Sequence, residues 1–287
     1  MTKIKDKIVL VTGGANGIGK MLGERCLQDG AAELVIWDIN SKNLKATTQE
    51  LKKKGYTVHA YLVDVSDLED IKKAATLTLS EVGPVDILFN NAGIVVGKYF
   101  EEHSHEDIEK TIRINVLGVM HVARAFVPEM MRKGGGHIIN ISSASAFIPN
   151  PKMSVYASSK WAVLGWSESL RLEMEDTAPH VKVTTVCPSY IKTGMFEGVT
   201  APLLAPLLEP EEIVNEIMQA IKDDEILVKA PISVNLIPIL RGVLPTRVFD
   251  FFIGRGLNIY NSMAKFVGRP TAEAIPDKES KDVSKVE

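Results

Sequence analysis

Short apolar runs alternate with longer stretches of helical periodicity along most of the chain. The runs at 7–11, 33–37, 57–63, 85–89, 137–141 and 181–186 are rich in apolar and β-branched residues, as buried parallel strands are. Helical patterns follow at 20–29, 42–54, 68–82, 106–131, 156–174 and 213–221, and a seventh short strand is expected at 226–228. We expect Pro128 to bend or end the helix over 106–131. The alternation predicts an α/β fold, a parallel sheet with helices on both faces.

The first apolar run leads directly into residues 12–19, whose sequence TGGANGIG is rich in glycine. Strand, glycine-rich turn and helix in this order are the context of a dinucleotide-binding loop. The glycines permit a tight turn and let the backbone approach a pyrophosphate, which then lies at the helix N-terminus. The alternative interpretation is a strand-to-helix turn without a ligand.

Acidic and small residues follow the next three strands. Asp38 lies about 20 residues beyond the glycine-rich loop, where a carboxylate accepts hydrogen bonds from a ribose and repels a 2′-phosphate. This position favours NAD over NADP, although Lys42 and Lys45 soften the repulsion, and Asp38 is alternatively a helix N-cap or turn residue. Asp64 is placed to contact an adenine amino group, and NNAG at 90–93 either admits a cofactor or only ends its strand.

Tyr156 and Lys160 lie one helical turn apart and so share a helix face. A nearby ammonium favours the phenolate and is expected to lower the pKa of Tyr156 from about 10, which suits proton transfer with an alcohol. Such a pair also occurs by chance, as an exposed tyrosine beside a solvated lysine.

The composition narrows the class of protein. The chain has 287 residues, 45% hydrophobic and 24% charged, with a net charge of −3, which gives no electrostatic case for nucleic acid binding. Cys26 and Cys187 are far apart in sequence and form no metal-binding motif, so we expect a reducing compartment and no metal site. We expect no signal peptide or spanning helix, and therefore a cytoplasmic protein.

The motifs combine into one family resemblance. In their order and spacing, TGGANGIG, Asp38, Asp64-Val65, NNAG, Asn115, Ser143, Tyr156, Lys160 and the segment 188–193 resemble the short-chain dehydrogenase/reductase family. The resemblance spans about 7–193 and implies an NAD(P)-dependent oxidoreductase with a single Rossmann-type, doubly wound domain over 1–230 and about seven strands. It implies cofactor contacts at Gly13, Asn16, Gly17, Ile18, Gly19, Asp38, Asp64, Val65, Asn91, Ala92, Gly93, Tyr156, Lys160, Pro188, Ile191 and Thr193.

The same resemblance assigns catalytic roles. Ser143, thirteen residues before Tyr156, would hydrogen-bond the substrate oxygen, with Ser142 as the weaker candidate. Tyr156 would act as general acid or base, and Lys160 would bind the nicotinamide ribose and lower the pKa of Tyr156. Asn115 would hold a water that links Lys160 to solvent. A homodimer formed through the helix of Tyr156 is implied, and no metal is needed.

The last third of the chain contains the segments that bear on the class of substrate. Residues 194–210 are apolar and proline-punctuated, which suggests either a lid over a lipophilic substrate or a segment packed on the protein's own core. Residues 231–269 are apolar with interspersed basic residues, and would lie on a lipid surface, on the substrate cleft or on a dimer partner. The polar tail 270–287 is expected to be disordered.

Segments 37–40 and 208–218 narrow the resemblance to the branch of type 11 and type 13 17-beta-hydroxysteroid dehydrogenases and related retinol dehydrogenases, which use NAD. This branch implies a retinoid, steroid or fatty alcohol as substrate. The alternative is an NAD-binding protein that works at a lipid surface, as a peripheral membrane protein with little turnover.

Overall fold

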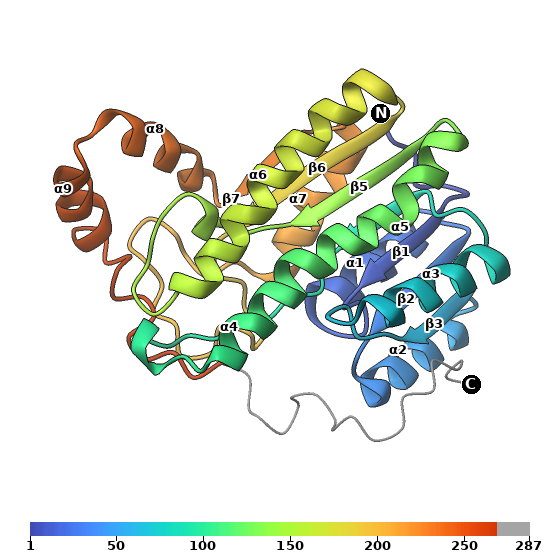
Figure 1. Cartoon of the computed structure of the whole chain (residues 1–287), viewed down its shortest axis with the longest axis horizontal. Helices are drawn as coiled ribbons and strands as arrows, with labels where there is room; N and C mark the ends of the chain where they lie inside the picture. The colour runs from blue at the N-terminus through green and yellow to red at the C-terminus, as the bar shows by residue number, and fades with distance from the viewer. Residues whose placement is uncertain (269–287) are drawn as a thin grey trace.

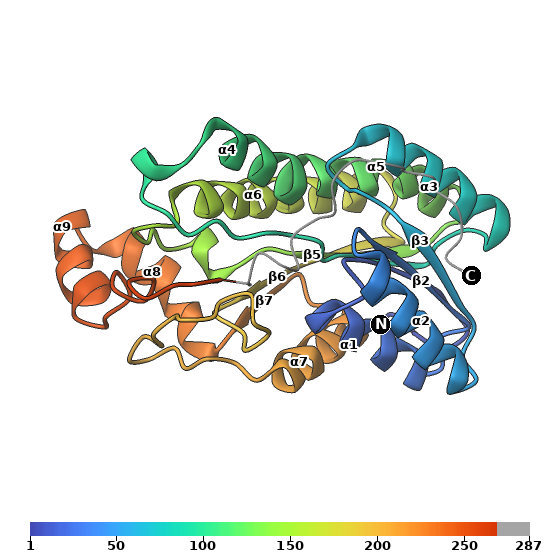
Figure 2. The ribbon, with the colours of Figure 1, turned by 90° about the horizontal axis from the view of Figure 1, so that it is seen from below.

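The computed structural model describes residues 1–268, in which a parallel sheet lies between two layers of helices (Figure 1, Figure 2). Its seven strands pair in parallel in the order β3-β2-β1-β4-β5-β6-β7, so the winding reverses between β1 and β4. The strands are β1 (Ile8–Thr12), β2 (Glu33–Asp38), β3 (Val58–Leu62), β4 (Ile87–Asn90), β5 (Gly136–Ile141), β6 (Val181–Pro188) and β7 (Leu227–Ala230). The predicted doubly wound, Rossmann-type α/β fold is confirmed.

Each face of the sheet has its own core. Successive side chains of a strand point to opposite faces, and Val9 and Val11 of β1 accordingly pack in one core while Leu10 packs in the other. The first core is covered by α1 (Gly17–Gln28), α2 (Ser41–Lys53) and α7 (Pro210–Asp223), as Figure 2 shows. The second is covered by α3 (Leu68–Glu81), α5 (Val119–Arg132) and α6 (Ser154–Thr177). Short 3₁₀ turns form η1 (Phe100–Glu102) and η3 (Ala144–Ala146).

The helix predicted over 106–131 consists of three pieces. They are α4 (His105–Ile112), the π-helical stretch η2 (Arg113–Gly118) and α5. Of the two effects expected of Pro128, ending the helix is wrong, because α5 continues to Arg132, whereas a bend stays a prediction. A proline removes one backbone hydrogen bond, but Phe126 and Met130 on either side of it are fully buried against the sheet and hold the turn in place.

The catalytic-motif helix α6 is less buried than its sequence predicts. The sequence favours Ala162, Leu164, Leu170 and Leu172 as core rather than site residues. Leu170 lies in the core, but Leu172 is 56% exposed and Ala162 is also exposed, so the core assignment is wrong for these two. Trp161 is 43% exposed on the same helix. Pairing of α6 with a second copy of the chain stays a prediction.

Beyond β7 the chain forms a projection and then returns. The projection contains η4 (Ile232–Asn235), α8 (Leu236–Val243), α9 (Thr246–Phe249) and the π-helical η5 (Asp250–Arg255), and it extends from one end of the molecule (Figure 1). Residues 257–268 then lie along the predicted lid, where Thr200 N–H donates to the Ser262 carbonyl and Val267 N–H donates to the Glu197 carbonyl, both at 2.9 Å. The predicted disordered tail lies outside the described residues.

None of the helices between residues 1 and 268 has the length and the apolar run that crossing a bilayer requires.

Candidate active site

The glycine-rich loop joins β1 to α1 in backbone conformations that favour glycine. Gly13 and Gly17 have φ angles of +63° and +55°. Asn16 is the N-cap of α1, and its side-chain oxygen accepts a hydrogen bond from Gly17 N–H at 2.7 Å. Ile18 lies half-buried in the first turn of α1. The first turn of the helix therefore presents backbone N–H groups at the carboxyl edge of the sheet, as the binding of a pyrophosphate requires.

The NNAG segment, at the end of the neighbouring strand β4, holds this loop in place. Asn91 Nδ2 donates to the carbonyls of Thr12 and Gly13 at 3.0 and 3.1 Å. The Thr12 hydroxyl accepts from the N–H groups of Asn91 and Ala92. A Cβ at Gly19 would lie 2.3 Å from the Gly13 carbonyl oxygen, so only glycine lets α1 start this close to the loop. The sequence motif did not assign this positioning role to Thr12.

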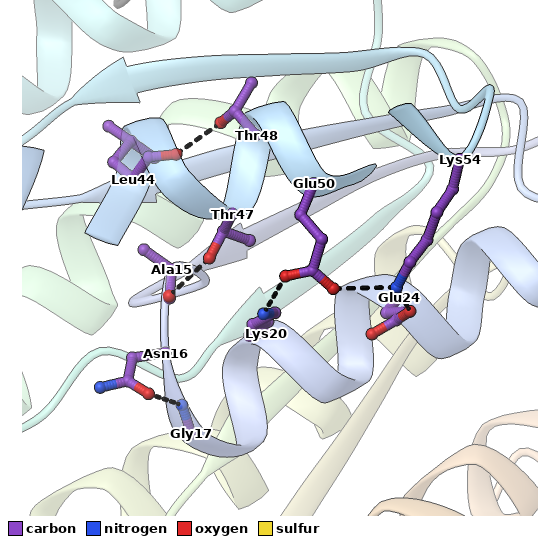
Figure 3. A network of polar contacts seen from close by, with 10 residues as sticks. All are labelled: Ala15, Asn16, Gly17, Lys20, Glu24, Leu44, Thr47, Thr48, Glu50 and Lys54. Carbon is purple, nitrogen blue, oxygen red and sulfur yellow. Dashed lines mark hydrogen bonds and ion pairs between the residues drawn. The ribbon is translucent and has the colours of Figure 1, made fainter. Parts of the chain in front are cut away.

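Helix α2 packs against the loop and holds it in place (Figure 3). The Thr47 hydroxyl donates to the Ala15 carbonyl at 2.9 Å. Glu50 pairs with Lys20 at 2.6 Å and with Lys54 at 2.9 Å, and these partners lower the pKa of Glu50 to about 2. The ion pairs are exposed and contribute little to stability, whereas the bond from Thr47 is buried and fixes the loop itself.

Asp38 and Asp64 lie at the carboxyl ends of β2 and β3. Asp38 accepts from Ala15 N–H at 3.0 Å and from Asn40 N–H at 2.9 Å, so its carboxylate is fixed beside the glycine-rich loop. The N-cap of α2 is Asn40, not Asp38. Asp64 accepts from the N–H and hydroxyl of Ser66 at 2.9 and 2.6 Å, and Val65 next to it is half-buried.

Tyr156 and Lys160 of α6 are both 5% exposed and face the end of β5. Lys160 Nζ donates to the Ile141 carbonyl at 2.8 Å and lies 5.7 Å from the centre of the Tyr156 ring. The alternative of an exposed tyrosine beside a solvated lysine is therefore wrong. Ser142 donates its hydroxyl to the Lys160 carbonyl at 2.9 Å, whereas the Ser143 hydroxyl makes a longer 3.4 Å bond to the Pro188 carbonyl. Ser143 is thus the serine more available to a substrate.

Burial is the largest influence on the pKa values of Tyr156 and Lys160. It raises the pKa of the Tyr156 phenol, although the nearby Ser143 hydroxyl acts in the opposite direction. It lowers the pKa of Lys160 to about 8. The expectation that Lys160 lowers the pKa of Tyr156 is wrong for the chain alone, because the loss of hydration penalises the charged form of both groups.

Asn115 lies in the π-helical stretch η2 and is fully buried. Its amide accepts from Ile94 N–H and donates to the Ile94 carbonyl, both at 2.9 Å, and donates to the Ser159 hydroxyl at 3.1 Å. It therefore ties the loop after β4 to α6, one residue before Lys160. Because its side-chain N–H groups are both used, they have no hydrogen for the predicted water, which leaves Oδ1 and the backbone of η2 as its partners. In η2 a π turn alters the usual hydrogen-bond pattern. That water stays a prediction.

The remaining predicted cofactor positions lie along the same sheet edge. A Cβ at Gly93 would lie 3.3 Å from Asn115 Oδ1 and 3.7 Å from Lys160 Nζ, so this glycine borders the catalytic side chains. Pro188 ends β6, Ile191 is buried and bridges to Leu208, and Thr193 is half-buried.

The predicted lid is divided between two environments. Phe196 and Leu207 pack in one cluster with Tyr156, whereas Leu203 is 73% and Leu204 58% exposed. The Phe196 ring meets the Tyr156 ring edge-on, with 6.2 Å between their centres. The environment of Tyr156 on the lid side is therefore apolar.

These residues fit a nicotinamide dinucleotide. Gly13, Gly19 and Asn91 pack so closely that a Cβ at Gly19 would clash with the other two residues, and Ala15 N–H in the same loop donates to the carboxylate of Asp38. In residues 1–268, no group of three or more His, Cys, Asp or Glu side chains is arranged to hold a metal ion. A dinucleotide loop and a buried Ser–Tyr–Lys set on one sheet edge define a dinucleotide-dependent oxidoreductase.

Known proteins show to which family this oxidoreductase belongs. The profile of the short chain dehydrogenase family matches residues 7–203, and the chain belongs to that family. Epidermal retinol dehydrogenase 2 of Mus musculus is 36% identical over 270 residues, with 93% of this chain and 87% of the relative covered. Estradiol 17-beta-dehydrogenase 11 of Pongo abelii is 36% identical over 245 residues, with coverages of 85% and 81%. The predicted family and branch are confirmed, and the protein is an enzyme.

Solved structures agree on the fold. A short chain dehydrogenase/reductase from Burkholderia phymatum in complex with NAD superimposes with a TM-score of 0.75 at 24% identity, covering 90% of this chain and 98% of that one. Another neighbour, a metagenomic short-chain oxidoreductase, is in complex with NADP. The family therefore uses either nicotinamide dinucleotide.

Proposed function

We propose that the protein interconverts an alcohol and a carbonyl on a lipophilic molecule, such as a retinoid, steroid or fatty alcohol, with NAD(H). The observation that carries the proposal is the buried Tyr156 phenol, which has Ser143 and Lys160 beside it and apolar lid residues above it. The names of the retinol and estradiol relatives support the same substrate class.

The chain's own residues supply orientation and proton transfer. Ser143 Oγ donates a hydrogen bond to the substrate oxygen and orients it toward Tyr156. In oxidation the Tyr156 phenolate accepts the hydroxyl proton, and in reduction the phenol returns it. Lys160 stabilises the phenolate when it forms, and Asn115 holds the loop and helix that fix Lys160. Bound NAD would supply the hydride acceptor for oxidation.

The full chain is tested with NAD and alcohols of increasing apolar size, including ethanol, decanol, retinol and estradiol. We expect kcat/KM to rise with apolar size, because the lid side of Tyr156 is apolar, and the absorbance of the reduced cofactor measures it. The absence of turnover with every alcohol and carbonyl, or a preference for small polar polyols, would contradict the proposal.

Cofactor choice provides a separate prediction. Asp38→Asn keeps the side-chain shape and an acceptor for Ala15 N–H but removes the charge that repels a 2′-phosphate. We expect the wild type to prefer NAD, and the variant to bind NADPH about tenfold more tightly, with NADH affinity changed much less. Cofactor fluorescence titration measures both constants. Equal affinities of the wild type for NADH and NADPH would refute the role of Asp38.

Attachment to an anionic lipid surface is a second candidate function, through the projection at 232–255. Its exposed apolar side chains Leu236, Ile239, Val243, Phe251 and Phe252 have between 55% and 77% of their surface exposed. Arg247 and Arg255 are exposed among them and suit lipid phosphates. Arg241 donates to the Phe147 carbonyl at 2.8 Å and lies 4.6 Å from the Trp161 ring, so α8 is fixed to the catalytic domain.

Vesicle flotation tests this second function. Replacing both Phe251 and Phe252 by Ser is expected to weaken binding to phosphatidylcholine/phosphatidylserine vesicles at least about tenfold, since each buried phenylalanine contributes about 2 kcal/mol. Leu172→Ser on α6, at an equally exposed leucine, is the control and should float like the wild type. Two results would exclude this use of the projection. One is flotation of the double variant that equals the wild type. The other is a wild-type dimer in the absence of lipid that the double substitution dissociates and Leu172→Ser does not.

A further inference from the structure

The segment 257–268, called the C-terminal cover below, contacts three loops at the carboxyl edge of the sheet. Leu203 N–H donates to the Leu257 carbonyl at 3.1 Å, which joins the cover to the lid. Lys152 Nζ lies 3.4 Å from the Ala264 carbonyl oxygen, which brings the cover to the loop before α6. The loop after β4 meets it at Gly97, which lies against Met263 and Phe266. The cover therefore bridges loops that follow β4, β5 and β6, around the end of the sheet where Tyr156 lies.

A buried polar network anchors the cover. Asn150 Nδ2 donates to both Tyr190 Oη and Ser262 Oγ at 2.8 Å, and these two hydroxyl oxygens are also 2.8 Å apart. Since Ser262 Oγ lies 2.7 Å from the Ile259 carbonyl and donates its proton there, Tyr190 is the donor to Ser262. The three side chains are no more than 9% exposed. Loss of the Ser262 hydroxyl would leave buried donors without a partner, which is costly.

The cover also reaches the catalytic tyrosine through apolar contacts. Met263 is 1% exposed and belongs to the same buried cluster as Tyr156 and Tyr190, with Phe266 packed against it. Phe196 of the lid lies between the two tyrosines, with ring centres 6.2 Å from Tyr156 and 5.1 Å from Tyr190. The cover therefore lies one side chain away from the phenol that handles the substrate proton.

Two glycines make this close approach sterically feasible. Gly198 in the lid has a φ of +81°, and a Cβ there would lie 2.0 Å from the Lys265 carbonyl oxygen. A Cβ at Gly97, after β4, would lie 2.4 Å from the Phe266 ring and 2.9 Å from Met263 Cε. Both contacts would force the cover to move, so the surrounding loops are shaped to accept it.

We infer that the C-terminal cover is a wall of the substrate site. Met263 and Phe266 limit the size of the apolar group that fits beside Tyr156, and Asn150, Tyr190 and Ser262 are positioning residues that hold the wall closed. The inference rests on the proposed function for its substrate class. Of these five residues, only Tyr190 lies within the motifs that carry the family resemblance, in the segment 188–193.

Met263→Ala tests the wall. We expect the ratio of kcat/KM for a bulky alcohol to that for a short one to rise about tenfold, the scale of discrimination that a few methylene groups give. NADH affinity should not change. Met174→Ala removes a buried methionine of α6 elsewhere and is the control, with an unchanged ratio expected. An unchanged ratio in Met263→Ala, with the protein folded and binding NADH, would overturn the inference.

Ser262→Ala tests the anchor. We expect KM for a lipophilic alcohol to rise about tenfold while kcat falls little, and amide hydrogen exchange in 257–268 to accelerate. Ser169→Ala, which removes an exposed serine hydroxyl on α6, is the control. Exchange that stays as slow as in the wild type would contradict the anchor.

These outcomes are distinguishable from failure of the proposed function. If the wild type oxidises no alcohol, the substrate class is wrong, and the exchange of 257–268 still reports whether Ser262 anchors the cover. If it oxidises alcohols but Met263→Ala keeps the wild-type size preference, the cover is not a wall of the site and the proposed function stands.

Discussion

Tyr156→Phe is expected to lower kcat for alcohol oxidation by about a hundredfold to ten-thousandfold, the range that positioned acid–base groups contribute. The substitution removes the only atom of this side chain that can exchange a proton. It keeps the ring, and with it the edge-on contact with Phe196 and the packing around Met153. NADH affinity and thermal stability should therefore stay near those of the wild type, which isothermal titration and thermal unfolding measure.

Tyr61→Phe is the matched control. Tyr61 is 1% exposed and donates to Glu81 at 2.8 Å, in the half of the sheet away from the catalytic helix. The Tyr61→Phe variant therefore also loses one buried hydroxyl. Its kcat should equal that of the wild type. Turnover by Tyr156→Phe at the wild-type rate would refute the proposed mechanism.

The pH dependence of this activity follows from the direction of the Tyr156 shift. Burial raises the pKa of the phenol, so the neutral form predominates at pH 7 in the chain alone. Oxidation needs the phenolate, whose small fraction grows with pH, and should accelerate as pH rises above 7, whereas reduction needs the phenol, which stays protonated over the same range, and should change little. Lys160, with its pKa lowered to about 8, also loses charge there and limits the gain in oxidation.

Local sequence was sufficient to predict the parts of the candidate site whose residues are close neighbours along the chain. The glycine-rich loop, the acid that ends β2 and the Tyr156–Lys160 pair are each defined within a few residues of a strand or helix end. Parallel strands bring those ends to one edge of the sheet, so separate motifs predicted one site.

Burial and long-range contacts were beyond such reasoning. The spacing of Tyr156 and Lys160 indicates a nearby charge but not the loss of hydration, which reversed the expected shift in the pKa of Tyr156. Asn150 and Ser262 are 112 residues apart and meet only because the chain returns after the projection. No periodic pattern marks either of them, and the π turn at Asn115 likewise has no signature in a stretch that reads as regular helix.

Gly19→Ala is expected to weaken NADH binding by about tenfold to a hundredfold. Helix propensity alone predicts the opposite, because alanine stabilises a helix by about 1 kcal/mol relative to glycine. At this position, however, the added Cβ would lie 2.3 Å from the Gly13 carbonyl oxygen and 2.5 Å from Asn91 Nδ2. Relief requires α1 to move away from the loop, which displaces the N–H groups that would bind the pyrophosphate and costs about 1–3 kcal/mol.

Gly165→Ala separates the effect of the steric clash at Gly19 from the effect of alanine's higher helix propensity. Gly165 lies inside α6, and a Cβ there would meet no atom within 4 Å, so this variant should be more stable by about 0.5–1 kcal/mol and bind NADH normally. Cofactor fluorescence and thermal unfolding of both variants give the comparison. Gly19→Ala with wild-type NADH affinity would mean that the close contact between loop and helix is not what shapes the dinucleotide site. A loss of affinity confined to Gly19→Ala would assign the requirement for glycine to backbone proximity, since both residues are helical and only one faces the loop.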